Sequence, residues 1–173
     1  RISENHYHMT TTTAQAANVL SHLEYYLQLV WPELNVNVVS TTEQWAGAAI
    51  AGPNSRALLM KLFPNTDVSN EALPFMGYKE SDLFGIPAKI YRISFSGELA
   101  YEVNVESDYG NFMWEKIIEV GKEFQIQAYG TEALSTLRIE MGHVAGSELD
   151  GRTIPHDASL EGLVSRKKDF IGK

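Results

Sequence analysis

The sequence contains no cysteine, and this single absence excludes several kinds of site together. Disulfide frameworks, thiol nucleophiles and zinc or iron-sulfur centres held by cysteine cannot form. Basic residues are also few, because 14 Lys and Arg stand against 22 Asp and Glu, and the formal net charge is −8. The basic run Arg166–Lys168 is short, so the sequence predicts no nucleic-acid partner and no attachment to an anionic membrane.

Long hydrophobic runs are missing as well. No apolar stretch approaches the roughly 20 residues that a membrane-spanning helix needs, and no signal peptide opens the chain. Together with the lack of cysteine, this pattern predicts a soluble, cytoplasmic protein. The glycine-rich motifs of Rossmann and P-loop sites and the Gly-x-Ser-x-Gly hydrolase motif do not occur. His6 and His8 share one face of an extended segment without a third ligand, so we predict no metal site.

Hydrophobic residues make up 44% of the 173 residues, which is enough for a packed core. The first part of the chain predicts short alternating elements. These are a β-branched strand over 10–13, a helix that ends at Trp31 before Pro32, strands over 36–39 and 45–50, and a helix over 56–63.

Three further strands are predicted over 78–83, 88–95 and 99–105. The connections between them are too short for crossovers, so the strands are expected to pair antiparallel. Helices follow over 108–120 and 130–140, and the residues after 143 carry several glycines and no periodicity. The expected fold class is α+β, with antiparallel sheets and packed helices.

Two charged residues lie among apolar positions and are therefore candidates for a site. Glu102 belongs to an apolar strand, where an unpaired carboxylate is costly, so we expect it to have a partner. Strand alternation places Tyr101 on the opposite face from Glu102. Arg138 shares the apolar stripe of a helix with Leu134 and Met141 and needs an anion or a carbonyl. Two alternatives remain open here: an ion pair between Glu102 and Arg138, or a ligand that uses both.

Several segments carry a resemblance to a known family. Arg92–Val103 (RISFSGELAYEV), Tyr129–Leu134 (YGTEAL) with Leu137–Gly142 (LRIEMG), and Lys168–Lys173 (KDFIGK) resemble the aminomethyltransferase, or glycine-cleavage T-protein, family. Within that family, Met9–Ala14 (MTTTTA), Gly52–Arg56 (GPNSR) and Asn70–Met76 (NEALPFM) are similar to the folate-binding C-terminal half of the α subunits of heterotetrameric sarcosine oxidases. The resemblance follows the whole chain in order.

This resemblance implies a site for tetrahydrofolate. The family's pterin-binding glutamate falls on Glu102, and its helix arginine falls on Arg138. A carboxylate accepts the donor pair formed by the 2-amino group and N3–H of a pterin, and a guanidinium suits a carbonyl or carboxylate. Phe95 matches an aromatic residue that precedes the glycine-glutamate motif of the family. The complete set of expected folate-binding residues is Glu102, Arg138, Phe95, Tyr101, Thr11 and Thr12.

By the same resemblance, the expected function is capture of the methylene unit from sarcosine oxidation as 5,10-methylenetetrahydrofolate. FAD, NAD and FMN are expected only elsewhere in a hetero-oligomer formed with the other sarcosine oxidase subunits. The family's catalytic aspartate lies upstream of the position that matches Arg1, so no catalytic residue is assigned. The chain, which begins without Met, is expected to be a fragment that is inactive in isolation.

The resemblance also divides the chain into parts. Residues 1–66 are expected to belong to a first folate-binding subdomain of strand-helix-strand-strand-helix order, residues 67–145 to a second α+β subdomain, and residues 146–173 to a connector toward a C-terminal barrel domain. Two alternative functions remain open. One is a T-protein-like aminomethyltransferase or demethylase that uses the same pocket, and the other is a non-catalytic scaffold module of an oxidase complex.

Overall fold

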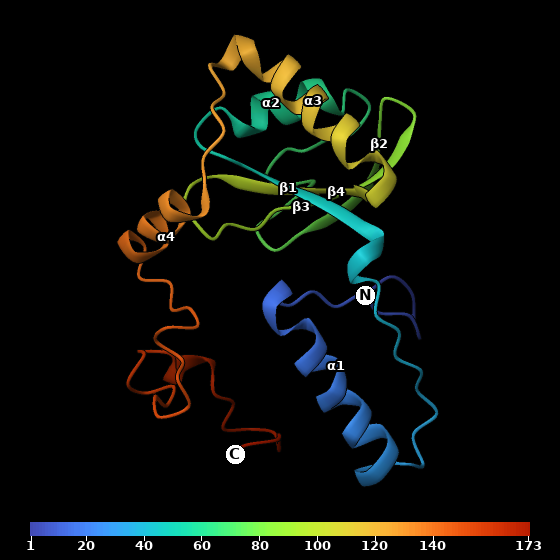
Figure 1. The fold of residues 1–173 in the computed structure, drawn as a ribbon, viewed down its shortest axis with the longest axis vertical. Helices are drawn as coiled ribbons and strands as arrows, with labels where there is room; N and C mark the ends of the chain where they lie inside the picture. Colours follow the sequence, from blue (N-terminus) through green and yellow to red (C-terminus); the bar gives the residue numbers. More distant parts are fainter.

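The computed structural model describes all residues from Arg1 to Lys173, and its centre is a four-stranded antiparallel sheet (Figure 1). The strands are β1 (Trp45–Ala51), β2 (Tyr78–Leu83), β3 (Ile86–Tyr91) and β4 (Ala100–Glu106). Their order across the sheet is β1-β4-β3-β2, so β4 is a central strand between β1 and β3. β4, the last strand in the sequence, thus joins β1 to the β2–β3 hairpin in one sheet.

Helices α2 (Ser55–Leu62) and α3 (Gly110–Gly121) cover one face of this sheet (Figure 1). Strand alternation sends every second residue of β4, namely Tyr101, Val103 and Val105, toward these helices, and all three are fully buried. Leu59, Leu62, Ile90 and Ile117 are among the residues that complete this core. Burial of such apolar side chains is the main term that stabilises a small α+β layer.

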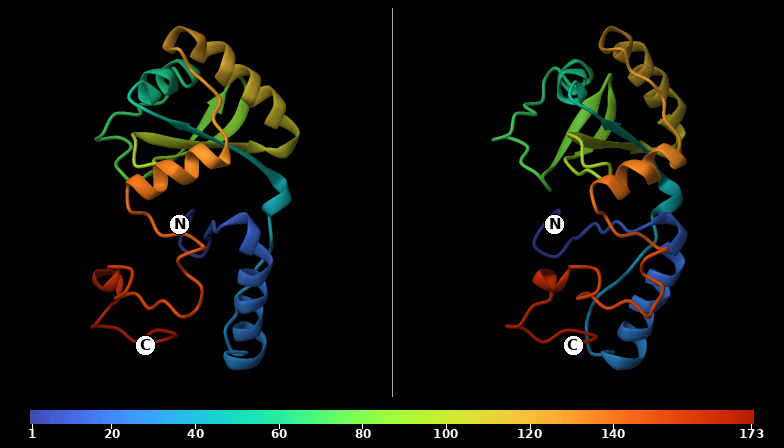
Figure 2. Two further views of the ribbon diagram at one scale, coloured as in Figure 1. Left: turned by 60° about the vertical axis from the view of Figure 1, so that its left-hand side comes forward. Right: turned by 90° about the vertical axis from the view of Figure 1, so that its left-hand side faces the viewer.

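The other face of the sheet is not covered by α2 or α3, and we call it the open face. The helices on this side are α1 (Ala16–Tyr25), which continues into a π-helical turn over Tyr26–Val30, and α4 (Thr131–Glu140) (Figures 1 and 2). No residue of α1 is buried. Both chain ends also lie on this side of the sheet (Figure 2). None of the helices combines the length and the apolar character that a membrane span requires.

The expected α+β class with antiparallel strands is confirmed, but several local predictions are wrong. Residues 10–13 and 36–39 form no strand, because β-branched residues favour extended backbone yet neither segment meets a strand to pair with. β3 ends at Tyr91 rather than at residue 95. β1 pairs with β4, so one sheet contains residues from both sides of position 66, and the division of the chain into two folate-binding subdomains stays a prediction.

The connection from β3 to β4 is held against the end of α4. Gly97 in this connection has φ +82°, a left-handed conformation that favours glycine, and a Cβ at this position would overlap the side chain of Met141. The ring of Phe95 stacks on His143 with a centroid distance of 5.9 Å and an interplanar angle of 8°. A side chain at residue 97 would therefore disturb the packing between this loop and α4.

We predict that Gly97→Ala destabilises the protein more than Gly85→Ala does. Gly85 also has a positive φ, +93°, but nothing lies within 4 Å of a Cβ placed there, so it reports backbone strain alone. Because Met141 is flexible and half exposed, the extra loss of unfolding free energy at Gly97 should be only about 1 kcal/mol. Denaturant unfolding of both variants measures it. Adding Met141→Ala should erase the difference, and a difference that persists would contradict the packing explanation.

Candidate functional site

The open face of the sheet brings Glu102 into a row of cross-strand neighbours. Glu102 on the central strand β4 faces Ala49 on β1 and Tyr91 on β3, and Tyr91 in turn faces Tyr78 on the edge strand β2. Opposed residues of this kind lie close enough for direct side-chain contact. The row therefore presents a carboxylate, two phenol rings and a small residue side by side.

Glu102 is a half-buried carboxylate that no group of the chain neutralises. It forms no hydrogen bond or ion pair, and burial raises the pKa of its carboxyl above the ordinary value. The partner expected for Glu102 is thus not supplied by the chain itself, and a ligand remains the open alternative. A carboxylate held half out of water without a donor is ready to accept hydrogen bonds from a ligand.

The two tyrosines form the aromatic part of the row. The rings of Tyr78 and Tyr91 lie 5.1 Å apart between centroids, and the hydroxyl of Tyr78 donates to Oε1 of Glu80 at 2.5 Å. Burial raises the pKa of Tyr78, and the hydrogen bond to Glu80 raises it further. Burial also raises the pKa of Tyr91, with Glu102 and Glu80 adding to the effect. Both phenols are therefore protonated at neutral pH and offer flat apolar surface.

A second row on the open face carries the positive charge. Lys89 on β3 faces Asn104, and its Nζ lies 3.7 Å from the ring centroid of Trp45, a cation–π contact. Burial lowers the pKa of Lys89. The N-terminal segment reaches the face here, because the ring of His8 meets Trp45 edge-on at 6.4 Å. Burial, and then the charge of Lys89, lower the pKa of His8.

Arg138 is not paired with Glu102. Its guanidinium donates to both carboxylate oxygens of Glu148, at 2.6 and 3.3 Å, and to the backbone carbonyl of His143 at 3.1 Å. Arg138 is only 9% exposed, and this hydrogen bonding holds the pKa of Glu148 at about 2. The prediction that Arg138 needs an anion or a carbonyl is confirmed, since it has both. The expected alternative of an ion pair with Glu102 is wrong.

The remaining sequence-predicted residues are scattered. Tyr101 is completely buried on the helix side of the sheet, where its hydroxyl accepts a hydrogen bond from Nε of Arg56 at 2.8 Å, so its side chain cannot reach a ligand on the open face. Phe95 is 46% exposed in the loop before β4. Thr11 and Thr12 are exposed and precede a short 3-10 turn, Thr13–Gln15. The structure therefore places Glu102 and Tyr101 back to back rather than in one site.

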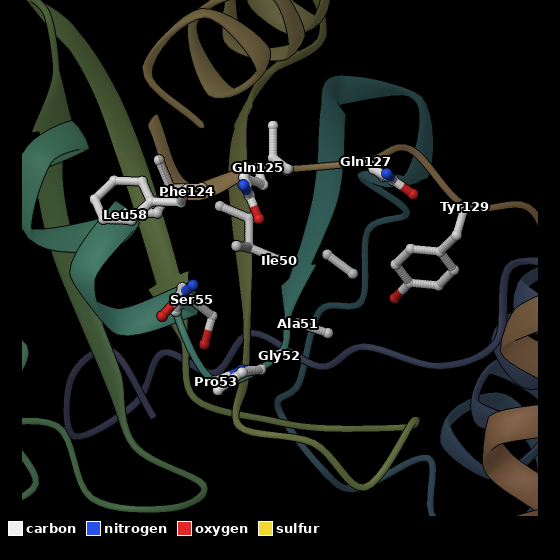
Figure 3. Close-up of a pocket in the computed structure, with 13 residues that line it drawn as sticks. Ile50, Ala51, Gly52, Pro53, Ser55, Leu58, Phe124, Gln125, Gln127 and Tyr129 are labelled. Carbon is white, nitrogen blue, oxygen red and sulfur yellow. The ribbon is translucent and has the colours of Figure 1, made fainter. Parts of the chain in front are cut away.

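A cavity of about 170 Å³ opens elsewhere, at the end of β1 (Figure 3). Tyr129 lies at one end of it and Leu58 with Phe124 at the other (Figure 3). None of the sequence-predicted residues lines it. The chain also has no cluster of three His, Asp or Glu residues able to hold a metal ion. Glu102 thus lies on the open face, apart from the lining of this cavity.

Sequence reasoning missed the neighbours that give Glu102 its setting. Tyr78, Tyr91 and Lys89 share its face, but they come from two other strands. The sequence predicts the alternation of side chains within each strand, but it does not predict the pairing register that sets these side chains beside Glu102.

Comparison with known proteins places this arrangement in a family. The model of the GCVT N-terminal domain matches residues 1–168. Sarcosine oxidase subunit alpha from Rhizobium meliloti (strain 1021) is 48% identical over 176 residues, covering 100% of this chain and 18% of the relative. Mitochondrial dimethylglycine dehydrogenase from Mus musculus is 36% identical over 142 residues, covering 80% of this chain and 16% of the relative.

An aminomethyltransferase from Chloroherpeton thalassium (strain ATCC 35110 / GB-78) is 31% identical over 175 residues, covering 100% of this chain and 46% of the relative. The chain thus spans less than half the length of each of these relatives. The resemblance found in the motifs around Glu102 and Arg138 is confirmed by these matches. The chain belongs to the aminomethyltransferase family, through a GCVT N-terminal domain that resembles the corresponding part of sarcosine oxidase alpha subunits.

Proposed function

We propose that this chain binds tetrahydrofolate on the open face of its sheet and that Glu102 recognises the pterin ring. The observation that carries the proposal is the half-buried carboxylate of Glu102, which has no partner in the chain. The 2-amino group and N3–H of a pterin are two parallel donors, and an ionised carboxylate accepts both. The two N–H donors of the ligand therefore match the carboxylate acceptor of Glu102.

The surroundings of Glu102 support a flat, partly apolar ligand. Tyr91 is its direct cross-strand neighbour, and Tyr78 continues the row with a ring 5.1 Å from that of Tyr91. A conjugated ring gains contact and dispersion energy against such surfaces. Ala49 on the other side of Glu102 is small and exposed, so it leaves room above β1.

Tetrahydrofolate supplies a nucleophilic nitrogen, and its condensation with formaldehyde gives 5,10-methylenetetrahydrofolate and water. The residues of this chain would hold the ligand so that this condensation does not depend on a chance encounter in water, an advantage of several kcal/mol. We assign no proton transfer to the residues described, because none of them is identified as catalytic.

Among one-carbon reactions, we favour capture of the methylene unit from sarcosine, because sarcosine oxidase alpha subunits match the whole chain at 47–48% identity. In this role the amine is oxidised elsewhere in a hetero-oligomer, where FAD, NAD and FMN would be bound by other segments or subunits. An aminomethyltransferase matches the whole chain at 31% identity. The lower identity makes glycine-cleavage chemistry the second candidate.

Arg138 is proposed as the second folate contact. In the free protein, Glu148 occupies the position at its guanidinium that the ligand would take. The Glu148 carboxylate is bidentate on the guanidinium, as a ligand carboxylate would be. A folate carbonyl or carboxylate would therefore have to displace Glu148 or bind at the free edge of the guanidinium. Phe95, stacked on His143 just beyond Arg138, would border the same place. Thr11 and Thr12 remain minor candidates.

We predict that Glu102→Gln weakens tetrahydrofolate binding by roughly tenfold to a hundredfold. The amide keeps the shape of the side chain but turns one acceptor into a donor that faces the donors of the pterin, and hydrogen bonds to charged groups contribute about 1.5–3 kcal/mol. Titration calorimetry measures the loss. Glu106→Gln is the matched control, since it removes a charge from the same strand and the same face at an exposed position. No tetrahydrofolate binding by the wild-type protein would favour the scaffold alternative.

The same variant should stabilise the free protein above the pKa of Glu102. Burial raises this pKa above its ordinary value of 4.5, so ionised Glu102 lowers the free energy of unfolding at pH values above the folded pKa. The penalty disappears as pH falls below 4.5, where the carboxyl is protonated in both states. Denaturant unfolding of Glu102→Gln at pH 7.5 and pH 4 should show a gain only at the higher pH. A loss of stability at pH 7.5 would mean that Glu102 has an internal structural role.

Exchange between Glu148 and ligand predicts opposite effects for the two partners. Arg138→Gln should weaken tetrahydrofolate binding, whereas Glu148→Gln should strengthen it several-fold, because the ligand no longer competes with a carboxylate. The pKa of Glu148 is lowered to about 2, so the ion pair is intact at neutral pH and is lost only as pH falls from 4.5 toward that value. Calorimetry at pH 7.5 tests both variants, with Asp150→Asn as a control that breaks the nearby pair with Arg152. Equal weakening by both substitutions would show that the pair only supports the fold.

A further inference from the structure

Two arginines line a cleft on the helix side of the sheet, away from Glu102. Arg56 comes from the first turn of α2, and Arg92 follows the last residue of β3. Alternation puts Arg92 on the face opposite Tyr91, which belongs to the open face. The full lining is Pro53, Arg56, Ala57, Met60, Asn70, Arg92 and Leu99. Both arginines are half-buried, and no acidic residue lines the cleft.

Neutral acceptors hold both guanidinium groups in place. Nε of Arg56 donates to the hydroxyl of Tyr101 at 2.8 Å, and its Nη2 donates to Oδ1 of Asn70 at 2.6 Å. Nη1 of Arg92 donates to the backbone carbonyl of Leu73 at 3.1 Å. A guanidinium has five N–H groups, so these bonds leave Arg56 and Arg92 with most of their donors free. The Nδ2 group of Asn70 is a further neutral donor at the same place.

No carboxylate neutralises this pair of charges. Arg138 and Arg152 each form an ion pair, but Arg56 and Arg92 form none. The chain has eight more acidic than basic residues, yet none of its carboxylates pairs with either arginine of this cleft. Tyr101 is fully buried and is therefore a rigid anchor for Arg56, so little side-chain freedom is lost when an anion binds.

We propose that this cleft is a second binding site, for an oxyanion group, either phosphate or carboxylate, carried on a small organic body. The fork of each guanidinium matches two oxygens of such a group. Pro53, Ala57, Met60 and Leu99 form the apolar part of the lining and would contact the organic body. This site goes beyond the folate proposal, because it lies on the other side of the sheet from Glu102.

The test is thermal unfolding of the protein at pH 7.5 in sodium phosphate, sodium glutarate and sodium chloride at matched ionic strength. A ligand that binds only the folded state raises the melting temperature in a saturable way. We expect phosphate, glutarate or both to raise it above the chloride value. Arg56→Gln with Arg92→Gln should abolish the increase, and each single substitution should weaken the apparent affinity at least tenfold. The control double variant, Arg152→Gln with Arg166→Gln, removes the same charge and should keep the increase.

The outcomes separate the possibilities. An increase with phosphate alone or with glutarate alone supports the site and identifies its anion class. Equal increases in the wild-type protein and the Arg56/Arg92 double variant would overturn the proposal, as would no increase beyond chloride with either anion. If the double variant does not fold, the NMR signals of the Nε–H groups of Arg56 and Arg92 are followed in the wild-type protein instead. The proposal is overturned if these signals do not shift when phosphate or glutarate is added. Glu102→Gln should leave the anion effect unchanged, so failure of the folate proposal is distinguishable.

Discussion

The central position of β4 is the constraint on which the rest of the structure depends. This strand is hydrogen-bonded to β1 on one side and β3 on the other, so its residues are fixed in register against both. Its residues Tyr101, Val103 and Val105 fill the core beneath α2 and α3. Because side chains alternate along a strand, Glu102 and Asn104 must then lie on the open face. The exposure of a costly carboxylate is thus enforced by the hydrophobic residues on either side of it.

The two faces of the sheet differ in the sign of the charge that lacks an oppositely charged partner. On the open face, burial raises the pKa of Glu102, which has no partner in the chain, and lowers that of Lys89, which Glu80 and the ring of Trp45 compensate only in part. On the helix side, Arg56 is held by neutral oxygens rather than by a carboxylate. By contrast, Arg138 and Glu148 satisfy each other. Unsatisfied groups held in fixed positions mark where binding energy is available, because the cost of ordering them has been met by folding.

The sequence predicted the fold wherever local signals and long-range pairing agree. Period-2 alternation and short turns located β2 and β4, and capping and apolar spacing located α3 and α4. The same local signal failed at residues 10–13 and 36–39, because β propensity cannot supply a pairing partner. Alternation was also enough to place Glu102 and Tyr101 on opposite faces. It could not show that Glu148, in a segment without periodicity, would be the anion that Arg138 requires.

Tyr101 and Glu102 are consecutive residues, and the peptide between them joins the two faces of the sheet. Tyr101 orients Arg56 on one face, while Glu102 stands beside Tyr91 on the other. Insertion or deletion of one residue in β4 would therefore move each following side chain to the opposite face of the sheet. A carboxylate would then enter the core, and a tyrosine would lie on the open face. Evolution can lengthen or shorten the loop before β4 with little penalty, but within this strand only substitutions are tolerable. Descendants of this domain are thus expected to keep the length of β4 constant even where the residues on either face have changed.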